Sequence, residues 1–208
     1  MRLGILAGGL IAGATAGALL VSPAHAARDH WFGITLGGSV PQGYFSDDAN
    51  TGTLVGFSYT LMLNGMLGVG ADVERHGWNA KDRVNAAAVA AYGPDSRYLL
   101  TAWQYMAHVM VLAPMSDNAP ARPYLIGGLG LYNPGFKIDG PLGHDRQTNS
   151  DPGFHGGGGV LLPGPRGSTL DLFVDYHQYK DDAHPKPAAW TSAGLRIHWT
   201  MRDAGLQP

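Results

Sequence analysis

The chain has 208 residues, with 14 Lys and Arg, 16 Asp and Glu, and no cysteine. A formal net charge of -2 and the absence of any Lys/Arg run argue against a nucleic-acid-binding surface. Without cysteine, neither disulfide bonds nor thiolate metal sites can form, so backbone pairing and side-chain packing must stabilise the fold.

Residues 1–26 have the features of a secretory signal peptide. Met1-Arg2 provides a charged start, residues 3–21 are apolar and small, and Ala24-His25-Ala26 matches an A-x-A cleavage site. A transmembrane anchor is the alternative, but Gly and Ala dilute the apolar run and Ser22-Pro23 ends it. We therefore expect export, with residues 27–199 forming one domain and residues 200–208 a short periplasmic tail.

From Trp31 to Trp199, about eight stretches alternate apolar with small or polar side chains, the period-2 pattern of strands. The predicted strands are residues 31–40, 53–63, 66–77, 97–112, 124–132, 153–162, 169–179 and 189–199. Residues 124–132 and 153–162 are too rich in glycine for their faces to be assigned. This rhythm predicts an all-β fold, an eight-stranded antiparallel up-and-down transmembrane β-barrel.

The predicted connections alternate in length, as expected when long loops face outside and shorter turns face the periplasm. Asn64-Gly65 is a two-residue hairpin signal, and residues 83–92 favour a short helix in the second outer loop. Residues 137–152 are expected to form another long outer loop. With an even number of strands, both termini should lie in the periplasm.

A soluble lipocalin-like barrel also has strands in which apolar and polar residues alternate. The composition of the polar face distinguishes it from a membrane barrel. That face is mostly Gly, Ser, Thr and Ala, sizes that suit a narrow lumen, while the lysines lie in or beside the outer loops (Lys81, Lys137, Lys180, Lys186). Aromatic residues near strand ends would form interfacial girdles: Trp31, Phe32, Tyr98, Tyr124, Tyr132, Phe154, Tyr176, Tyr179, Trp190 and Trp199. The pattern therefore favours the outer membrane.

Four segments resemble the outer-membrane protein β-barrel domain family, which includes small OmpA-, OmpX- and OmpW-like barrels. They are RPYLIGGLGLY (122–132), GFHGGGGVLLP (153–163), LDLFVDYHQY (170–179) and AGLRIHW (193–199). The resemblance implies a barrel in the Gram-negative outer membrane and implies no single activity. Members commonly end on the aromatic residue of the last strand, which the assembly machinery reads, whereas nine residues follow Trp199 here.

The inward face of the predicted barrel carries polar and charged residues that would form a lumen network: Asp72, Glu74, His76, Gln104, His108, Asp171, Asp175, His177, Arg196 and His198. Charges in a narrow lumen need partners, and Arg196 lies on the strand expected to pair with that of Asp171 and Asp175. We expect ion pairing that plugs the barrel rather than catalysis.

Three functions are compatible with this pattern. The first is a structural or cell-surface interaction role with a mostly plugged lumen. The second is a narrow channel for small or apolar molecules, which requires unpaired lumen groups around water. The third is a lipid-modifying enzyme, which requires a Ser or Thr within hydrogen-bonding reach of His177. Pairing of Arg196 with Asp171 or Asp175 would favour the first, and we do not expect an enzyme.

No cofactor is expected, and the nine histidines show no H-x-H or H-x-x-x-H spacing that would predict a metal site. The glycines of residues 153–159 lack a following Gly-Lys-Ser/Thr and favour close strand packing over a phosphate loop. The expected partners are outer-membrane lipids and lipopolysaccharide, the barrel-assembly machinery, and a surface partner that the outer loops contact.

Overall fold

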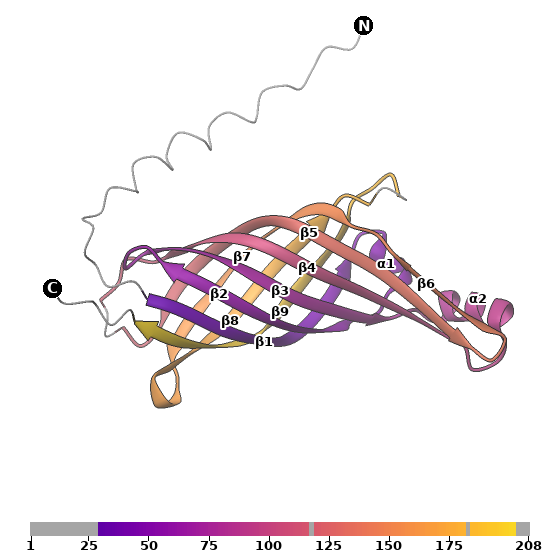
Figure 1. The fold of residues 1–208 in the computed structure, drawn as a ribbon, viewed down its shortest axis with the longest axis horizontal. Coiled ribbons are helices and arrows are strands. Elements are labelled where there is room, and N and C mark those ends of the chain that lie inside the picture. The colour runs from indigo at the N-terminus through magenta and orange to yellow at the C-terminus, as the bar shows by residue number, and fades with distance from the viewer. Residues whose placement is uncertain (1–28, 117–118, 182–183, 203–208) are drawn as a thin grey trace, which may run out of the picture.

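The computed structural model describes residues 29–116, 119–181 and 184–202, which form a closed antiparallel barrel (Figure 1). Its strands are β1 (Asp29–Gln42), β2 (Gly52–Met62), β3 (Leu67–Asn79), β4 (Arg97–Leu112), β5 (Arg122–Gly140), β6 (Gly143–Thr148), β7 (Asp151–Pro163), β8 (Ser168–Tyr179) and β9 (Ala188–Arg202). Strands that follow one another in the chain pair, except that β6 and β7 both pair with β5, and β1 pairs with β9 to close the barrel. The predicted signal peptide lies outside the described residues.

The barrel has eight strand positions, as predicted, because β6 and β7 occupy successive parts of one position beside β5. The outer half of β5 pairs with β6 through Gly135–Gly140, and its inner half pairs with β7 through Arg122–Tyr132. The predicted loop at residues 137–152 is therefore largely a hairpin. Its polar residues do not alternate with apolar ones because neither face of this extension meets lipid. Backbone pairing alone therefore holds these strands together.

Two other boundaries differ from the sequence prediction. Strand β9 continues beyond Trp199 to Arg202, because Asp29–Trp31 of β1 provide backbone partners for its last residues. The predicted two-residue turn at Asn64-Gly65 is wrong, since the connection spans residues 63–66. There the Asn64 side chain accepts hydrogen bonds from the backbone N–H groups of Met66 (2.8 Å) and Leu67 (2.7 Å), which holds a wider turn.

The predicted helix in the second outer loop is confirmed as α2 (Asp82–Tyr92), and a short helix α1 (Phe45–Asp48) occupies the first outer loop. Both lie at the end of the barrel from which the β5–β6 hairpin projects (Figure 1). Among the described residues, no helix combines the length and apolar character needed to span a membrane.

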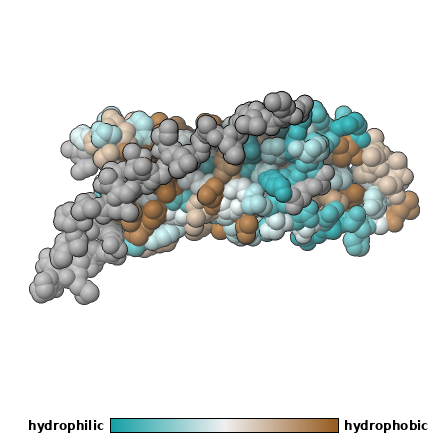
Figure 2. Space-filling model, turned by 90° about the horizontal axis from the view of Figure 1, so that it is seen from above, coloured by the Kyte–Doolittle hydropathy of each residue, from teal (hydrophilic) through white to brown (hydrophobic). Residues whose placement is uncertain are grey.

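Apolar side chains cover the outside of the wall, as the alternation predicts. On β8, Leu172 is 52% exposed and Val174 is also exposed, whereas Asp171 and Asp175 point inward and are buried. Figure 2 shows hydrophobic patches along the visible wall and a hydrophilic region in the half that carries α1 and α2, with an apolar tip beyond it. The wall therefore offers a lipid-facing surface around a polar interior.

Several aromatic residues expected in interfacial girdles lie inside the barrel instead. Tyr124, Tyr132, Tyr179 and Trp190 are all buried, and Trp31 packs partly against the interior. Their side chains point to the inward face of their strands. Nearness to a strand end does not show which face of the strand a residue occupies. Phe57, Trp103, Tyr105, Phe154, Tyr176 and Trp199 are exposed on the wall.

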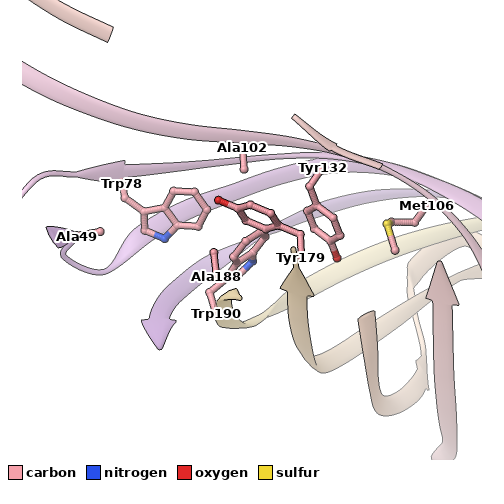
Figure 3. Packing of buried hydrophobic residues seen from close by; sticks show 8 residues of the cluster. All are labelled: Ala49, Trp78, Ala102, Met106, Tyr132, Tyr179, Ala188 and Trp190. Carbon is pink, nitrogen blue, oxygen red and sulfur yellow. The ribbon is translucent and has the colours of Figure 1, made fainter. Parts of the chain in front are cut away.

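Two apolar layers close the lumen above and below its polar middle. The outer aromatic layer contains Ala49, Trp78, Ala102, Met106, Tyr132, Tyr179, Ala188 and Trp190, and Figure 3 shows its large side chains directed toward one another. Trp78 and Trp190 meet edge to face with ring centroids 5.2 Å apart. The inner apolar layer contains Leu54, Met62, Met110, Leu112, Tyr124, Ile126, Leu161 and Phe173.

Replacing Leu172 by arginine (Leu172→Arg) should lower the free energy of unfolding by about 2–4 kcal/mol, because it places a charge in the hydrocarbon core. Leu142→Arg, at the 77% exposed tip of the β5–β6 hairpin, is the matched control and should cost no more than about 1 kcal/mol. A urea titration of the barrel folded into lipid vesicles measures both. Equal costs would contradict the assignment of the lipid-facing surface.

Candidate functional site

The ten residues expected in the lumen network all point into the barrel, and each is at most 4% exposed. They come from β3, β4, β8 and β9, and they lie between the outer aromatic layer and the inner apolar layer. We call them, with the hydroxyl groups that they contact, the lumen network.

Arg196 is at the centre of this network. Its Nε donates to Thr35 Oγ1 at 2.8 Å, Nη1 contacts Asp171 Oδ2 at 3.4 Å, and Nη2 contacts Glu74 Oε1 at 3.3 Å. The guanidinium carbon also lies 4.8 Å from the centre of the Phe173 ring. One side chain therefore links β9 to β1, β8 and β3.

Asp171 is the shared acceptor on the inner side of the network. Besides Arg196, its Oδ2 accepts a hydrogen bond from the Tyr124 hydroxyl at 3.0 Å and lies 3.3 Å from His198 Nε2. Asp171 and Arg196 are direct partners in the β8–β9 register, so backbone pairing itself brings the charges together. The sequence suggested Asp171 or Asp175 as the partner of Arg196. The guanidinium contacts Asp171, and the second carboxylate that it contacts belongs to Glu74.

A second branch of the lumen network runs from Glu74 across the barrel. Gln104 Nε2 donates to Glu74 Oε2 at 2.5 Å, and Gln104 Oε1 lies 3.2 Å from His76 Nε2. His76 Nδ1 is 2.7 Å from Ser39 Oγ, which is 3.1 Å from Ser192 Oγ. The branch thus links β3, β4, β1 and β9 through hydrogen bonds.

A third branch pairs Asp72 with His108. Asp72 Oδ2 and His108 Nδ1 are 2.6 Å apart, and His108 Nε2 lies 3.0 Å from Thr60 Oγ1. This carboxylate–imidazole–hydroxyl arrangement joins three neighbouring strands, β2, β3 and β4. It restricts the imidazole orientation by contacts at both nitrogens.

Some buried polar atoms in the lumen, including atoms of network residues, have no hydrogen-bond partner. Among the described residues, buried atoms without a hydrogen-bond partner include Asp175 Oδ1, His177 Nε2 and both ring nitrogens of His155. His177 Nδ1 lies 3.3 Å from the Tyr132 hydroxyl. His177 therefore has one ring nitrogen in contact with a partner and the other directed into the lumen without one.

Sequence reasoning missed several members of the network. Thr35, Ser39 and Thr60 resemble ordinary small lumen residues, and nothing in their spacing distinguishes them. His155 lies in the glycine-rich stretch whose faces could not be assigned; exposed Phe154 beside it gives the only local indication of phase. At Gly157 an added Cβ would collide with Asp175 Oδ1 and the Val174 carbonyl, which supports the packing role expected for these glycines.

A cavity of about 390 Å³ opens at the outer end of the barrel. Trp78 and Trp190 contribute to its lining, together with Tyr44, Phe45, Tyr98 and Phe136. We call this cavity the outer pocket. Tyr44 stacks on His184 with ring centroids 3.8 Å apart, and its hydroxyl donates to Asp181.

Burial, and then the hydrogen bond to Asp181, raise the pKa of Tyr44 well above that of a free phenol, so Tyr44 remains protonated and donating. The outer pocket is thus aromatic and carries two carboxylates, Asp48 and Asp181, in its lining.

The geometry around His177 does not match a serine hydrolase. Within the described residues, the hydroxyl in contact with its ring is that of Tyr132, and no Ser or Thr hydroxyl takes that place. A Ser–His pair does occur between Ser39 and His76, but Ser39 is 0% exposed in the barrel interior. A hydroxyl in this position has no route to a lipid substrate.

A family model described as outer membrane protein beta-barrel domain matches residues 13–191. The chain belongs to this family. Its place is accordingly the outer membrane, with the apolar wall toward lipid and the lumen network inside. No curated protein matches the sequence.

Solved barrels of this kind share the fold of this chain at low sequence identity. Neisserial surface protein A (NspA) is 13% identical, with a TM-score of 0.54 over 84% of this chain and 98% of its own. Ail, the attachment invasion locus protein of Yersinia pestis, solved with the heparin analogue sucrose octasulfate, is 15% identical, with a TM-score of 0.52 over 85% and 100%. A major outer membrane protein of Thermus thermophilus is 12% identical, with a TM-score of 0.54 over 85% and 100%.

Proposed function

We propose that this protein is a closed outer-membrane barrel with a structural or cell-surface interaction role, exerted through its outer end. The observation that carries the proposal is the occupied lumen: the outer aromatic layer, the lumen network and the inner apolar layer follow one another along the axis. An eight-stranded barrel has room for little beyond such side chains.

The pairing of Arg196 is the feature that the sequence identified as favouring a plug. Its guanidinium contacts both Asp171 and Glu74, and all three side chains are almost fully buried. Separating these charges inside the dry lumen would leave each one buried without its partner, at a cost of several kcal/mol per ion. This supports closure over the narrow channel for small or apolar molecules.

The outer end is tied together in a way that suits a fixed contact surface. Arg83 of α2 pairs with Asp48 of α1 at 2.7 Å, and the Leu142 backbone N–H donates to the Tyr92 carbonyl at 3.1 Å. Asn85 Oδ1 accepts from the backbone N–H of Tyr98 at 3.0 Å. Loops held in one arrangement lose less entropy when they bind a partner. NspA and Ail, which share this fold, are a surface protein and an attachment protein by name.

We also propose that the chain is not an enzyme. The full burial of the Ser39–His76 pair and the Tyr132 contact at His177 support this, because a hydrolase needs an activated hydroxyl that its substrate can reach. The outer pocket is aromatic and anionic, which fits binding rather than nucleophilic chemistry.

Lipopolysaccharide is the partner best matched by the outward-facing charges near the outer end. Arg75, Arg97, Lys137 and Arg146 are exposed there, and guanidinium and ammonium groups bind phosphate through charge-assisted hydrogen bonds. A contact with the barrel-assembly machinery is expected at the other end, where β9 leaves its final pairing with β1. We propose both contacts as partners of this barrel.

Reconstituted into planar bilayers, the barrel should give no stepwise conductance, because the two apolar layers and the lumen network block the axis. A variant with Trp190, Glu74, Asp171, Arg196 and Phe173 all replaced by alanine is the positive control. It removes large side chains from the outer layer, the middle and the inner layer, and the guanidinium leaves together with its two carboxylate partners, so conductance should appear. Regular conductance steps from the unaltered protein would contradict closure and favour the channel.

Lipopolysaccharide in the outer leaflet of vesicles should raise the thermal unfolding temperature of the barrel, since a ligand that binds the folded state stabilises it. Arg75→Gln combined with Arg146→Gln should reduce this rise, because two phosphate-binding groups are lost. The control is Arg166→Gln in the exposed turn before β8, at the opposite end of the barrel. If all three proteins respond equally, the proposed phosphate contacts are wrong.

A further inference from the structure

We propose that the lumen contains a binding site for a divalent transition-metal ion, of which zinc is the best fit, formed by Glu74, His76 and His177. Each residue offers one ligand atom, and these atoms all lie within 4.8 Å of one another. The site is independent of the proposed surface role, since metal binding and the absence of conductance are measured separately.

The three residues come from opposite walls of the barrel. Glu74 and His76 are two residues apart on β3 and share its inward face, whereas His177 is on β8. Around the closed sheet, β2, β1 and β9 separate β3 from β8 on one side, and β4, β5 and β7 do so on the other. A metal ion would therefore connect the two walls through the middle of the lumen. The sequence spacing of the histidines gave no such indication, because closure of the barrel creates the cluster.

His177 is already oriented as a ligand. The Tyr132 hydroxyl lies 3.1 Å from the Phe154 carbonyl, which can only accept, so its single hydrogen is used there. The Tyr132 oxygen must then accept from His177 Nδ1, 3.3 Å away, which places the imidazole hydrogen on Nδ1. His177 Nε2 is left as a bare lone pair, fully buried and without a partner among the described residues. A hydrogen bond on the remote nitrogen is the usual way in which a protein fixes a metal-binding histidine.

His76 reaches the ligand form by a change of tautomer. Without metal, its Nε2–H donates to Gln104 Oε1 at 3.2 Å, because an amide oxygen can only accept, and Ser39 Oγ donates to Nδ1 at 2.7 Å. If the hydrogen moves to Nδ1 and Ser39 turns its own hydrogen to Ser192 Oγ at 3.1 Å, Nε2 is freed 3.9 Å from Glu74 Oε2. Gln104 Oε1 then becomes a nearby neutral oxygen able to complete the coordination.

Glu74 can serve the metal while it keeps its partner in the lumen network. Oε1 contacts Arg196, and Oε2 faces Gln104 and His76. Two imidazole nitrogens and one carboxylate oxygen form a donor set that zinc uses, with bonds of about 2.0–2.2 Å and ligand atoms about 3.3 Å apart. Modest side-chain rotation would close the present cluster to that size.

The charges of the lumen favour a cation. Four buried carboxylates, Asp72, Glu74, Asp171 and Asp175, share the lumen with Arg196, the only buried Lys or Arg in the described part of the chain. A divalent ion beside these carboxyl groups would favour their ionised form and compensate its charge. Oxygen-only cations fit less well, since two of the three ligands are imidazoles.

The outer pocket provides the access route. Trp78 and Trp190 line it, and the ligands stack directly on them: His76 on Trp78 at 5.6 Å and His177 on Trp190 at 5.2 Å between ring centroids. The ion would reach its ligands when the Trp78–Trp190 contact opens.

The test uses the full-length barrel in detergent, stripped of metal with a chelator and titrated with zinc chloride alone. Equilibrium dialysis with elemental analysis gives stoichiometry and affinity, while a change in tryptophan fluorescence, to which Trp78 and Trp190 beside the site contribute, accompanies binding. We expect one zinc ion per chain and a rise in the thermal unfolding temperature, because the metal stabilises the folded state. An unaltered protein that takes up no zinc would overturn the proposal.

His177→Gln and His76→Gln should each weaken zinc binding by more than about tenfold. Removing a group that only hydrogen-bonds to a metal ligand already costs at least about that much. His108→Gln changes another buried lumen histidine, whose hydrogen bonds to Asp72 and Thr60 do not involve the cluster, and should leave the affinity unchanged. If His144→Gln, on the exposed face of β6, abolishes uptake instead, the binding is an adventitious surface event and the proposal fails.

A second measurement covers the case in which a lumen variant does not fold, which a heat-dependent shift in gel mobility would reveal. Cobalt(II) added to the metal-free unaltered protein should give the visible absorption of a low-coordinate nitrogen–oxygen site. A spectrum identical to that of hydrated cobalt would overturn the proposal without any variant.

Discussion

The guanidinium of Arg196 is the constraint on which the interior of this barrel depends. A charge removed from water costs several kcal/mol unless its donors are matched, and here Asp171, Glu74 and Thr35 provide the acceptors. These partners lie on three other strands, so the pairing holds the wall together at several points. The register of β8 with β9 makes Asp171 the direct neighbour of Arg196, and a one-residue slip of either strand would turn that strand's charge toward lipid.

The layers above and below this centre follow from the same requirement. Ion pairs are strongest where water is excluded, and the outer aromatic layer and inner apolar layer exclude it from both ends. Trp190, 0% exposed, packs against Trp78, His76 and His177, and thus separates the lumen network from the outer pocket. A barrel filled in this way leaves its outer end as the surface for interactions, with α1, α2 and the β5–β6 hairpin tied to one another.

The sequence predicted the eight strand positions and the inward or outward direction of most side chains. Where one face of a strand meets lipid, alternate residues must be apolar, and this alternation can be read in the sequence. Asp171 and Leu172 are the clearest case. It did not predict the β5–β6 hairpin, where neither face meets lipid and alternation is lost. It misplaced Trp190 and Tyr132, since an aromatic residue near a strand end satisfies either an interfacial or an internal position. The meeting of Glu74 and His76 with His177 could not be predicted, because it depends on the closure and stagger of the barrel.

A double-mutant cycle between Arg196 and Glu74, with Arg196→Met and Glu74→Gln alone and together, tests the central role of the guanidinium most directly. The two residues lie on β9 and β3, with β1 and β2 between them, so backbone pairing alone cannot couple them. Free energies of unfolding in lipid vesicles should give a coupling of at least about 1 kcal/mol, as expected for residues in one buried network. Additive effects, with no coupling, would contradict an interior organised around Arg196.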